Sequence, residues 1–358
     1  LALVLSLVLV VGVVATLAAC GGKEETPKSD FEYIQEKGEL VIGITYFAPM
    51  NYFDENAQEF KNPKAVVWTD GYRCLESMRY IPQMSAQVKS LNDRLAAGET
   101  FDALRKELRK HVPSFTWYPQ TEFCYMLNSD GWFVAAKGGH NNESHNHNDI
   151  GTFTLYADGI PMFVDAGVGT YTKKTFSKER YTIWSMCSDW HNLPVINGVT
   201  QKDGRKFRSA SVKAVDGKSA KTFALDIKGA YPEESGCQSW VRDYKLTAKA
   251  LVITDTYALK ERKGADVENF MVQGVVYLSG ETTPAGYLVK KGEVVVGNND
   301  VYMSLAYPAA LTPSVEVKEL DDPRFTKVWG DKLRRISFTS SPSAPLKGKY
   351  VFQIKRIN

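Results

Sequence analysis

The sequence predicts a mainly β protein, most of which is an antiparallel β-sandwich. After Pro113, short runs rich in β-branched and aromatic residues alternate with turn residues, as is typical of such folds. Asp-Gly pairs, which favour tight hairpin turns, begin at Asp130, Asp158, Asp203 and Asp216. The runs expected as strands are 123–127, 132–136, 152–156, 162–164, 221–227, 246–254, 270–278, 292–296, 301–305 and 350–354. No repeat of long period is visible, so a propeller or solenoid is not expected.

Composition excludes several other classes of protein. The chain has 358 residues, of which 44% are apolar and 12% aromatic, with a formal net charge of +3. Disordered, collagen-like and disulfide-stapled small proteins have different compositions. Only residues 1–19 form an apolar stretch long enough to cross a bilayer, which excludes a multi-span membrane protein.

The N-terminal residues 1–20 resemble a bacterial lipoprotein signal peptide. They carry no charge and end in Leu17-Ala18-Ala19-Cys20, where small residues precede a cysteine. A lipid on Cys20 would anchor the mature chain to the membrane at the periplasm or cell surface. The alternative is a plain membrane anchor, but the polar stretch 21–30 is typical of a lipoprotein tether. The other four cysteines have no C-x-x-C spacing, so a zinc ribbon or redox pair is not expected.

The next two segments are short. Residues 31–56 resemble the start of an extracytoplasmic solute-binding protein, but the alternating helices and strands of such a protein do not follow. We therefore interpret 21–60 as a linker and truncated stub, joined to the rest by gene fusion or an assembly error. The pattern of residues 61–112 predicts one or two surface helices, with a helix break at Gly98 and a helix end before Pro113.

Histidines are concentrated in one segment. Three of the five histidines, His140, His145 and His147, lie in GGHNNESHNHNDIGTF. If the H-x-H pair lay on a strand, both rings would point to the same face. Polar neighbours that could orient the imidazoles by hydrogen bonds are Asn146, Asn148 and Asp149.

A carboxylate and a further histidine follow within 50 residues. Asp165 comes directly after the apolar run 162–164, and His191 stands in Ser188-Asp189-Trp190-His191-Asn192. Taken alone, Asp165 is an ordinary cap or turn residue and His191 an ordinary core histidine. Two imidazoles and a carboxylate from separate segments are, however, the ligand types of a zinc site with an open position. Together these residues predict a metal site.

From Trp117 to Gly198 the sequence resembles the heparinase II/III-like polysaccharide lyases, which include related alginate lyases. The resemblance rests on AAKGGHNNESHNHNDIGTF, PMFVDAGVGTY, ERYTIWSMCSDWHN and LPVINGV, and extends more weakly over the remaining strands to residue 358. It implies that residues 113–358 are the β-sandwich domain of a lyase. In that family an α/α toroid faces the sandwich, and the cleft between them cleaves uronate-containing chains by β-elimination.

The resemblance also implies roles for individual residues. His147, Asp165 and His191 would bind Zn²⁺, which would hold the histidine-bearing loops in place. His145 would lie in the cleft beside the substrate. The catalytic candidates are His145 together with Tyr171 or Tyr181 and Arg180, which lie in the segment that usually lines the cleft.

The chemistry of β-elimination explains these residue types. The C5 proton of a uronate is weakly acidic, so its removal requires that the adjacent carboxylate be neutralised and the enolate-like charge stabilised. Histidine, asparagine or arginine can do this, while a tyrosine or histidine takes the C5 proton and a tyrosine protonates O4. Elimination needs no hydroxide nucleophile, so hydrolysis is not expected.

The toroid of the family has no clear counterpart in this sequence. It normally supplies the principal catalytic tyrosine with asparagine and histidine partners, whereas segment 61–112 offers only Tyr72 and Tyr80, which we interpret as packing residues. Three alternatives stay open: the chain is inactive alone, a partner chain supplies the toroid, or the sequence joins two genes.

Two non-lyase functions were also weighed. A solute-binding protein fragment would explain residues 1–56 but not the histidines. A non-catalytic carbohydrate-binding lipoprotein would explain the tryptophans, namely Trp117, Trp132, Trp184, Trp190 and Trp240. Nucleic-acid binding is not expected, because the sequence has no continuous basic stripe. Residues 1–60 hold 3 Lys+Arg against 9 Asp+Glu, which leaves 41 against 32 in 61–358, a basic part suited to an anionic polysaccharide such as a glycosaminoglycan.

Overall fold

The computed structural model describes residues 90, 93–100, 103 and 113–357. The predicted signal peptide with Cys20, the stub at 21–60, and Tyr72 and Tyr80 lie outside these residues. Contacts divide the chain into two units, 1–106 and 107–358. In the first unit, residues 93–96 are helical and the turn ends at Gly98, whose φ of +95° confirms the predicted break. Nowhere in the described ranges does a helix have the length and apolarity needed to span a membrane.

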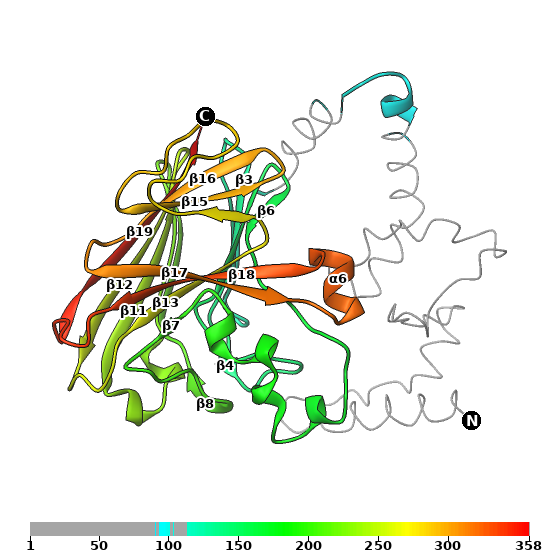
Figure 1. The fold of residues 1–358 in the computed structure, drawn as a ribbon. Coiled ribbons are helices and arrows are strands. Elements are labelled where there is room, and N and C mark those ends of the chain that lie inside the picture. Colours follow the sequence, from blue (N-terminus) through cyan, green and yellow to red (C-terminus); the bar gives the residue numbers. More distant parts are fainter. Residues whose placement is uncertain (1–89, 91–92, 101–102, 104–112, 358) are drawn as a thin grey trace, which may run out of the picture. The chain divides into compact units, whose positions relative to one another are not determined.

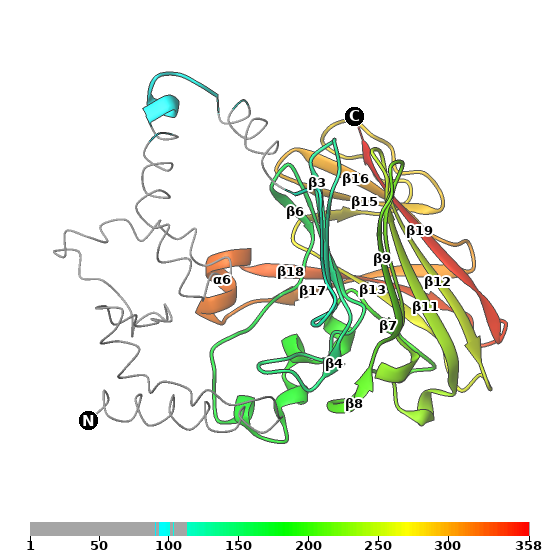
Figure 2. The same cartoon turned by 180° about the vertical axis from the view of Figure 1, so that it is seen from behind.

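The second unit is a sandwich of two large sheets, in which every strand pairing is antiparallel (Figures 1 and 2). In spatial order the first sheet contains β1 (Phe115–Tyr118), β2 (Phe123–Leu127), β3 (Trp132–Lys137), β5 (Phe153–Ala157), β6 (Ile160–Phe163), β13 (Val267–Val272), β18 (Lys332–Ser340) and β17 (Leu311–Glu319), with β7 (Pro194–Val195) paired to β13. The second contains β14 (Val275–Tyr277), β15 (Glu293–Asn298), β16 (Val301–Ala306), β19 (Lys347–Ile357), β12 (Leu251–Leu259), β11 (Cys237–Leu246), β10 (Lys221–Asp226) and β9 (Ala210–Asp216). The predicted fold class is thus confirmed.

Smaller elements lie outside the two sheets. β4 (His140–Asn141) pairs with β8 (Gly204–Arg208). The segment that follows β6 contains four single-turn 3₁₀ helices: η2 (Lys174–Phe176), η3 (Arg180–Thr182), η4 (Trp184–Met186) and η5 (Ser188–Trp190). Two further turns are η6 (Lys228–Ala230) and η7 (Glu233–Ser235), and α6 (Pro323–Trp329) joins β17 to β18 (Figure 1).

The core lies between the sheets because apolar side chains alternate along the strands. In β2, Cys124 and Met126 are fully buried and their neighbours are only half-buried, which is the period-2 pattern of a strand with one face in the core. Aromatic rings from the two sheets meet in the middle. Phe153 lies 5.5 Å from Tyr244, and Phe270 lies 4.9 Å from Phe352, between ring centroids. These contacts close the sandwich.

The H-x-H pair does not lie on a strand, so the condition for both rings to point to one face is not met. Residues 142–149 form a loop between β4 and β5, and His145 has a φ of 60° in the left-handed region, which no strand residue adopts. The Asn-, Ser- and Glu-rich sequence offers no alternating apolar side chains to bury. As a result, the two rings are free to point toward different partners.

Two long runs predicted as single strands are each divided. Run 270–278 breaks at Gly274, where the chain passes from β13 in the first sheet to β14 in the second. A Cβ at Gly274 would collide with the carbonyl oxygen of Gly297, so glycine allows the close crossing. Run 246–254 contains the turn 247–250 between β11 and β12. The pair Asp203-Gly204 does not close a hairpin either, because Gly204 begins β8.

Three long strands that the sequence did not predict, β11, β17 and β18, each contain three charged residues. In β11, Arg242 has only 1% of its surface exposed. A charged residue at an inward position looks like a surface residue in the sequence. The described cysteines, Cys124, Cys187 and Cys237, are all unbonded.

Candidate functional site

The three predicted metal ligands lie together at one end of the first sheet. One potential ligand atom from each of His147, Asp165 and His191 lies within 4.8 Å of the other two, although the residues come from separate segments. His147 is in the 142–149 loop, Asp165 follows β6, and His191 follows η5. The rings of the two histidines are 5.4 Å apart. The fold therefore brings these three side chains together, although they come from separate segments of the chain.

His191 is the most enclosed member of this triad. It is fully buried, its Nδ1 lies 2.7 Å from Oδ2 of Asp165, and its Nε2 is buried with no hydrogen-bond partner in the part of the chain that the structure describes. Burial opposes the charged imidazole, but the Asp165 carboxylate outweighs this effect and raises the pKa of His191. For Asp165 the balance is similar: burial opposes ionisation, but His191 and the Gly167 amide hold its pKa below the usual range.

His147 has the opposite electrostatic environment. Burial, followed by the proximity of His191, lowers the pKa of His147 to about 4. A neutral imidazole keeps a lone pair, which a metal ligand requires. The triad thus combines an ionised carboxylate, a neutral imidazole and a buried nitrogen without a partner.

Asn192 fixes the backbone beside His191. Its side-chain amide donates to the carbonyl oxygens of Phe153 and Val164, at 2.6 and 3.0 Å, and its Oδ1 accepts from the amide of Met271 at 2.6 Å. These partners belong to β5, the end of β6 and β13, so one buried side chain ties the His191 segment to three neighbouring strand positions. The position of His191 therefore depends on the strands of the first sheet and not only on its own loop.

A buried charge network supports the same segment from the second sheet. Arg242 of β11 donates to the carbonyl oxygen of Asn192 at 2.7 Å, to both carboxylate oxygens of Asp255, and to Glu268 of β13 at 2.7 Å. Trp240 also donates to Asp255, at 2.8 Å. Because one guanidinium is shared by two carboxylates, a buried negative charge would remain if both were ionised. Burial and the charge of Asp255 raise the pKa of Glu268 well above its usual value, despite Arg242.

His145 turns away from the triad and pairs with Tyr171. The two rings are stacked, with centroids 6.2 Å apart and planes within 2°, and the Tyr171 hydroxyl lies 3.4 Å from Nδ1 of His145. Arg324 of α6 lies over the Tyr171 ring, 5.5 Å from its centroid. The structure therefore brings His145 and Tyr171 together, as the sequence analysis expected of residues lining one cleft.

Arg180 and Tyr181 make different contacts. Arg180 donates twice to the carbonyl oxygen of Asn146, at 3.0 and 3.2 Å, and once to that of Thr175, at 2.9 Å. Tyr181 donates to Oδ1 of Asn146 at 2.9 Å. Both side chains hold the histidine loop in place. Asn146 therefore binds Arg180 and Tyr181, and within the described residues it makes no hydrogen bond to an imidazole.

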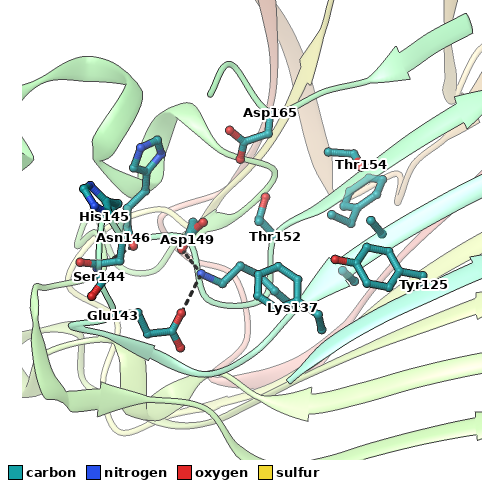
Figure 3. Close-up of a pocket in the computed structure, with 15 residues that line it drawn as sticks. Tyr125, Lys137, Glu143, Ser144, His145, Asn146, Asp149, Thr152, Thr154 and Asp165 are labelled. Carbon is teal, nitrogen blue, oxygen red and sulfur yellow. Dashed lines mark hydrogen bonds and ion pairs between the residues drawn. The ribbon is translucent and has the colours of Figure 1, made fainter. Parts of the chain in front are cut away.

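A pocket of about 410 Å³ opens beside the triad (Figure 3). Lys137 lies in its wall, only 9% exposed, with its ammonium 2.7 Å from Asp149 and 3.9 Å from Glu143. Burial disfavours the ammonium, but the Asp149 carboxylate raises the pKa of Lys137. The other lining residues are Phe123, Tyr125, Ala135, Ala136, Ser144, His145, Asn146, His147, Thr152, Phe153, Thr154 and Asp165.

Comparisons with known proteins agree with this architecture. The sequence matches the family described as heparinase II/III-like, C-terminal, over residues 110–315. The chain belongs to this family. No curated protein matches the sequence.

Three solved heparinases share the fold of this heparinase II/III-like chain. A heparinase III gene product aligns with 16% identity and a TM-score of 0.53, covering 68% of this chain and 35% of its own. The heparan sulfate lyase HepC from Pedobacter heparinus aligns with 15% identity and a TM-score of 0.51, covering 68% and 36%. Another heparinase III aligns with 18% identity and a TM-score of 0.51, covering 68% and 37%. The chain thus spans little more than a third of the length of these structures.

The heparinase II/III-like match covers every predicted site residue except Cys20, which also lies outside the described residues. The sequence did not point to Lys137, Arg242, Glu268 or Arg324. Each is a charged residue on an ordinary strand or helix, and no local motif marks it. The polar neighbours Asn146 and Asp149 were expected to orient imidazoles, but Asp165 does so for His191.

Proposed function

We propose that this chain is the sandwich module of a polysaccharide lyase that cleaves a uronate-containing, anionic polysaccharide by β-elimination. The observation that carries the proposal is the convergence of His147, Asp165 and His191 beside the His145–Tyr171 pair. This arrangement combines a candidate metal centre with titratable side chains in one place, on the sandwich of a lyase-related family.

The triad fits zinc. Two imidazoles and one carboxylate are a common three-residue donor set for Zn²⁺, and the buried Nε2 of His191 has no other partner among the described residues. In a tetrahedral site, ligand atoms lie about 3.3 Å apart, so small side-chain movements would suffice. Bound zinc would supply a cross-link between the histidine loop, the end of β6 and the His191 segment, and so hold His145 in position.

The elimination itself is assigned to the side chains of this chain. Tyr171 or His145 takes the C5 proton of the uronate, the electron pair forms the C4=C5 double bond, and the bond from C4 to O4 breaks. A protonated Tyr171 or Tyr181 returns a proton to the leaving oxygen. A neighbouring cation neutralises the uronate carboxylate so that the C5 proton becomes more acidic.

The solved heparinases extend well beyond the part that this chain matches. We therefore propose that an α/α toroid on a partner chain adds further walls to the cleft, while the proton-transfer residues belong to the sandwich itself. One observation favours the non-catalytic alternative, a carbohydrate-binding module: Nε, Nη1 and Nη2 of Arg180 each donate to a backbone carbonyl oxygen and not toward the cleft.

One assay separates these functions. The purified chain is incubated with heparan sulfate, chondroitin sulfate and alginate, and the ultraviolet absorbance of the unsaturated uronate product is followed. We expect product from at least one polymer, and a loss of at least about 100-fold in Tyr171→Phe, the scale of a positioned proton-transfer group. Tyr302→Phe, on β16 away from the site, is the matched control.

Each outcome of this assay has a defined meaning. Binding without product supports the carbohydrate-binding alternative. Neither binding nor product with any of the three polymers contradicts both functions. Equal activity of Tyr171→Phe and Tyr302→Phe would remove Tyr171 from the chemistry.

A further inference from the structure

An exposed cation and an exposed aromatic ring both lie against Tyr171. The guanidinium of Arg324 lies 5.5 Å from the centroid of the Tyr171 ring. Phe176 packs its ring against that of Tyr171 in an edge-on geometry, at 5.5 Å, yet is 71% exposed. A large apolar ring left in water beside titratable side chains is typical of a ligand-facing surface. Sugar rings pack well against such surfaces because their C–H faces are apolar.

Helix α6, which carries Arg324, is fastened to the Tyr171 loop at both ends. At its start, Asp322 accepts hydrogen bonds from the amide and hydroxyl of Thr170, at 2.5 and 2.8 Å. At its end, the indole of Trp329 donates to the carbonyl oxygen of Ala166 at 2.9 Å. Helix α6 lies between β17 and β18 of one hairpin (Figure 1). Its contacts with Thr170 and Ala166 hold the backbone of Arg324 in a defined place beside the Tyr171 loop.

The donors of Arg324 are largely uncommitted. Its side chain makes one weak hydrogen bond, to the carbonyl oxygen of Gly169 at 3.5 Å, and no ion pair with any carboxylate in the described part of the chain. Asp322, the nearby acid, accepts from Thr170 and from the Arg324 backbone amide. Arg180, by contrast, is engaged by three hydrogen bonds to backbone.

Other arginines of the same hairpin are also committed. Arg334 donates to the carbonyl oxygens of Gln273 and Gly274, and Arg335 pairs with Glu316 and Asp189. Arg324 is therefore the guanidinium of this hairpin that forms no ion pair within the described residues, although the nearby Asp322 carboxylate lies within its electrostatic reach.

We propose that Arg324 binds the acidic group, a carboxylate or a sulfate, of the sugar unit that lies against Tyr171 and Phe176. The contact with the Tyr171 ring keeps the guanidinium beside that ring, and its free N–H groups can form a forked pair of hydrogen bonds with an oxyanion. This makes Arg324 a specificity residue for acidic sugars. The inference rests on the proposed function, because it assigns the recognition of substrate charge at that same site.

Binding measurements on the whole chain test this inference. Arg324→Gln removes the charged guanidinium and leaves a shorter, neutral polar side chain, and Lys327→Gln removes an exposed charge from the same helix without touching Tyr171. Each variant is titrated calorimetrically with a heparan sulfate oligosaccharide, an unsulfated oligouronate and a neutral oligosaccharide of equal length. Thermal unfolding checks that both variants are folded.

We expect Arg324→Gln to bind acidic oligosaccharides roughly 10-fold more weakly, and Lys327→Gln to bind as the wild type does. A loss with the unsulfated oligouronate identifies the carboxylate as the bound group, and a loss confined to heparan sulfate identifies the sulfate. Salt dependence of binding should fall in Arg324→Gln, because one ionic contact is missing.

The failures of the two proposals can be told apart. If the wild type cleaves an acidic polymer and Arg324→Gln binds that polymer equally well, the Arg324 inference is wrong and the lyase proposal stands. Equal losses in Arg324→Gln and Lys327→Gln would show non-specific charge attraction and would also overturn the inference. Absence of binding in the wild type would overturn both.

Discussion

At the scale of single residues, the site is defined by which buried polar atoms have a hydrogen-bond partner and which do not. The buried Nε2 of His191 lacks a hydrogen-bond partner, and leaving such an atom unpaired costs about 1–3 kcal/mol. A metal bound to it would remove this cost. His140, in contrast, lies in β4 outside the triad, although it belongs to the same histidine-rich segment. Position in the fold, and not proximity in sequence, separates these two histidines.

Zinc content provides the test at this scale. We expect the wild type to bind one zinc ion per chain and His147→Ala to bind it at least about 100-fold more weakly, because a ligand is lost. His140→Ala should bind zinc as the wild type does. Metal content by mass spectrometry after dialysis, with competition by a chelator, measures both. A wild-type protein that retains no zinc, or equal binding by His147→Ala, would contradict the assignment.

At the scale of elements, α6 is a short helix whose geometry depends on one side chain. Asp322 is its N-cap and accepts from the Arg324 amide at 2.9 Å, while also binding Thr170 of the Tyr171 loop. A helix of one or two turns has little stability of its own. The cap therefore both starts the helix and joins it to the site.

Removal of this cap should have a measurable cost. We expect Asp322→Ala to lower the free energy of unfolding by about 1–2 kcal/mol, the range for loss of an N-cap. Asp321→Ala, at the neighbouring exposed position, should change it by less than about 0.5 kcal/mol. Urea unfolding of both variants gives the comparison. Equal stabilities would show that α6 is held by Trp329 and apolar packing alone.

At the scale of the whole molecule, the sandwich encloses a charge network that reaches both sheets. Arg242 and Asp255 lie on strands of the second sheet and Glu268 on the first, and all three are buried. Isolated buried charges are costly, and here two carboxylates share a single guanidinium. The raised pKa of Glu268 follows from this imbalance and from burial.

Stability should therefore depend on pH through Glu268. Since its folded pKa is raised, the folded protein holds more protons than the unfolded chain above pH 4.5, so this contribution to stability decreases as pH rises from there. We expect the unfolding free energy of the wild type, relative to Glu268→Gln, to fall between pH 5 and 8 by at most about 1.4 kcal/mol per pH unit. Glu316→Gln, on the exposed face of β17, should show no such trend. A difference between wild type and Glu268→Gln that is constant with pH would exclude the effect.

The sequence by itself determined the β class, the family and the residues of the triad. Strand alternation, turn dipeptides and clustered histidines are local patterns, and a local pattern can be recognised within a single segment of the sequence. It also placed Asp165 and His191 beside strands, where the structure has them. The orientation of the H-x-H pair did not follow from the sequence, because two histidines alone do not determine whether a segment is a strand or a loop; the surrounding residues do.

Only the tertiary structure decided how charged side chains are used. Arg180 and Arg324 look equivalent in the sequence, yet one is bound to backbone carbonyls of the histidine loop and the other lies exposed over Tyr171. Arg242 looks like a surface residue of β11 but is buried between the sheets. These differences depend on which distant segments the chain path brings together, and contacts between distant segments leave no periodic signal in either segment.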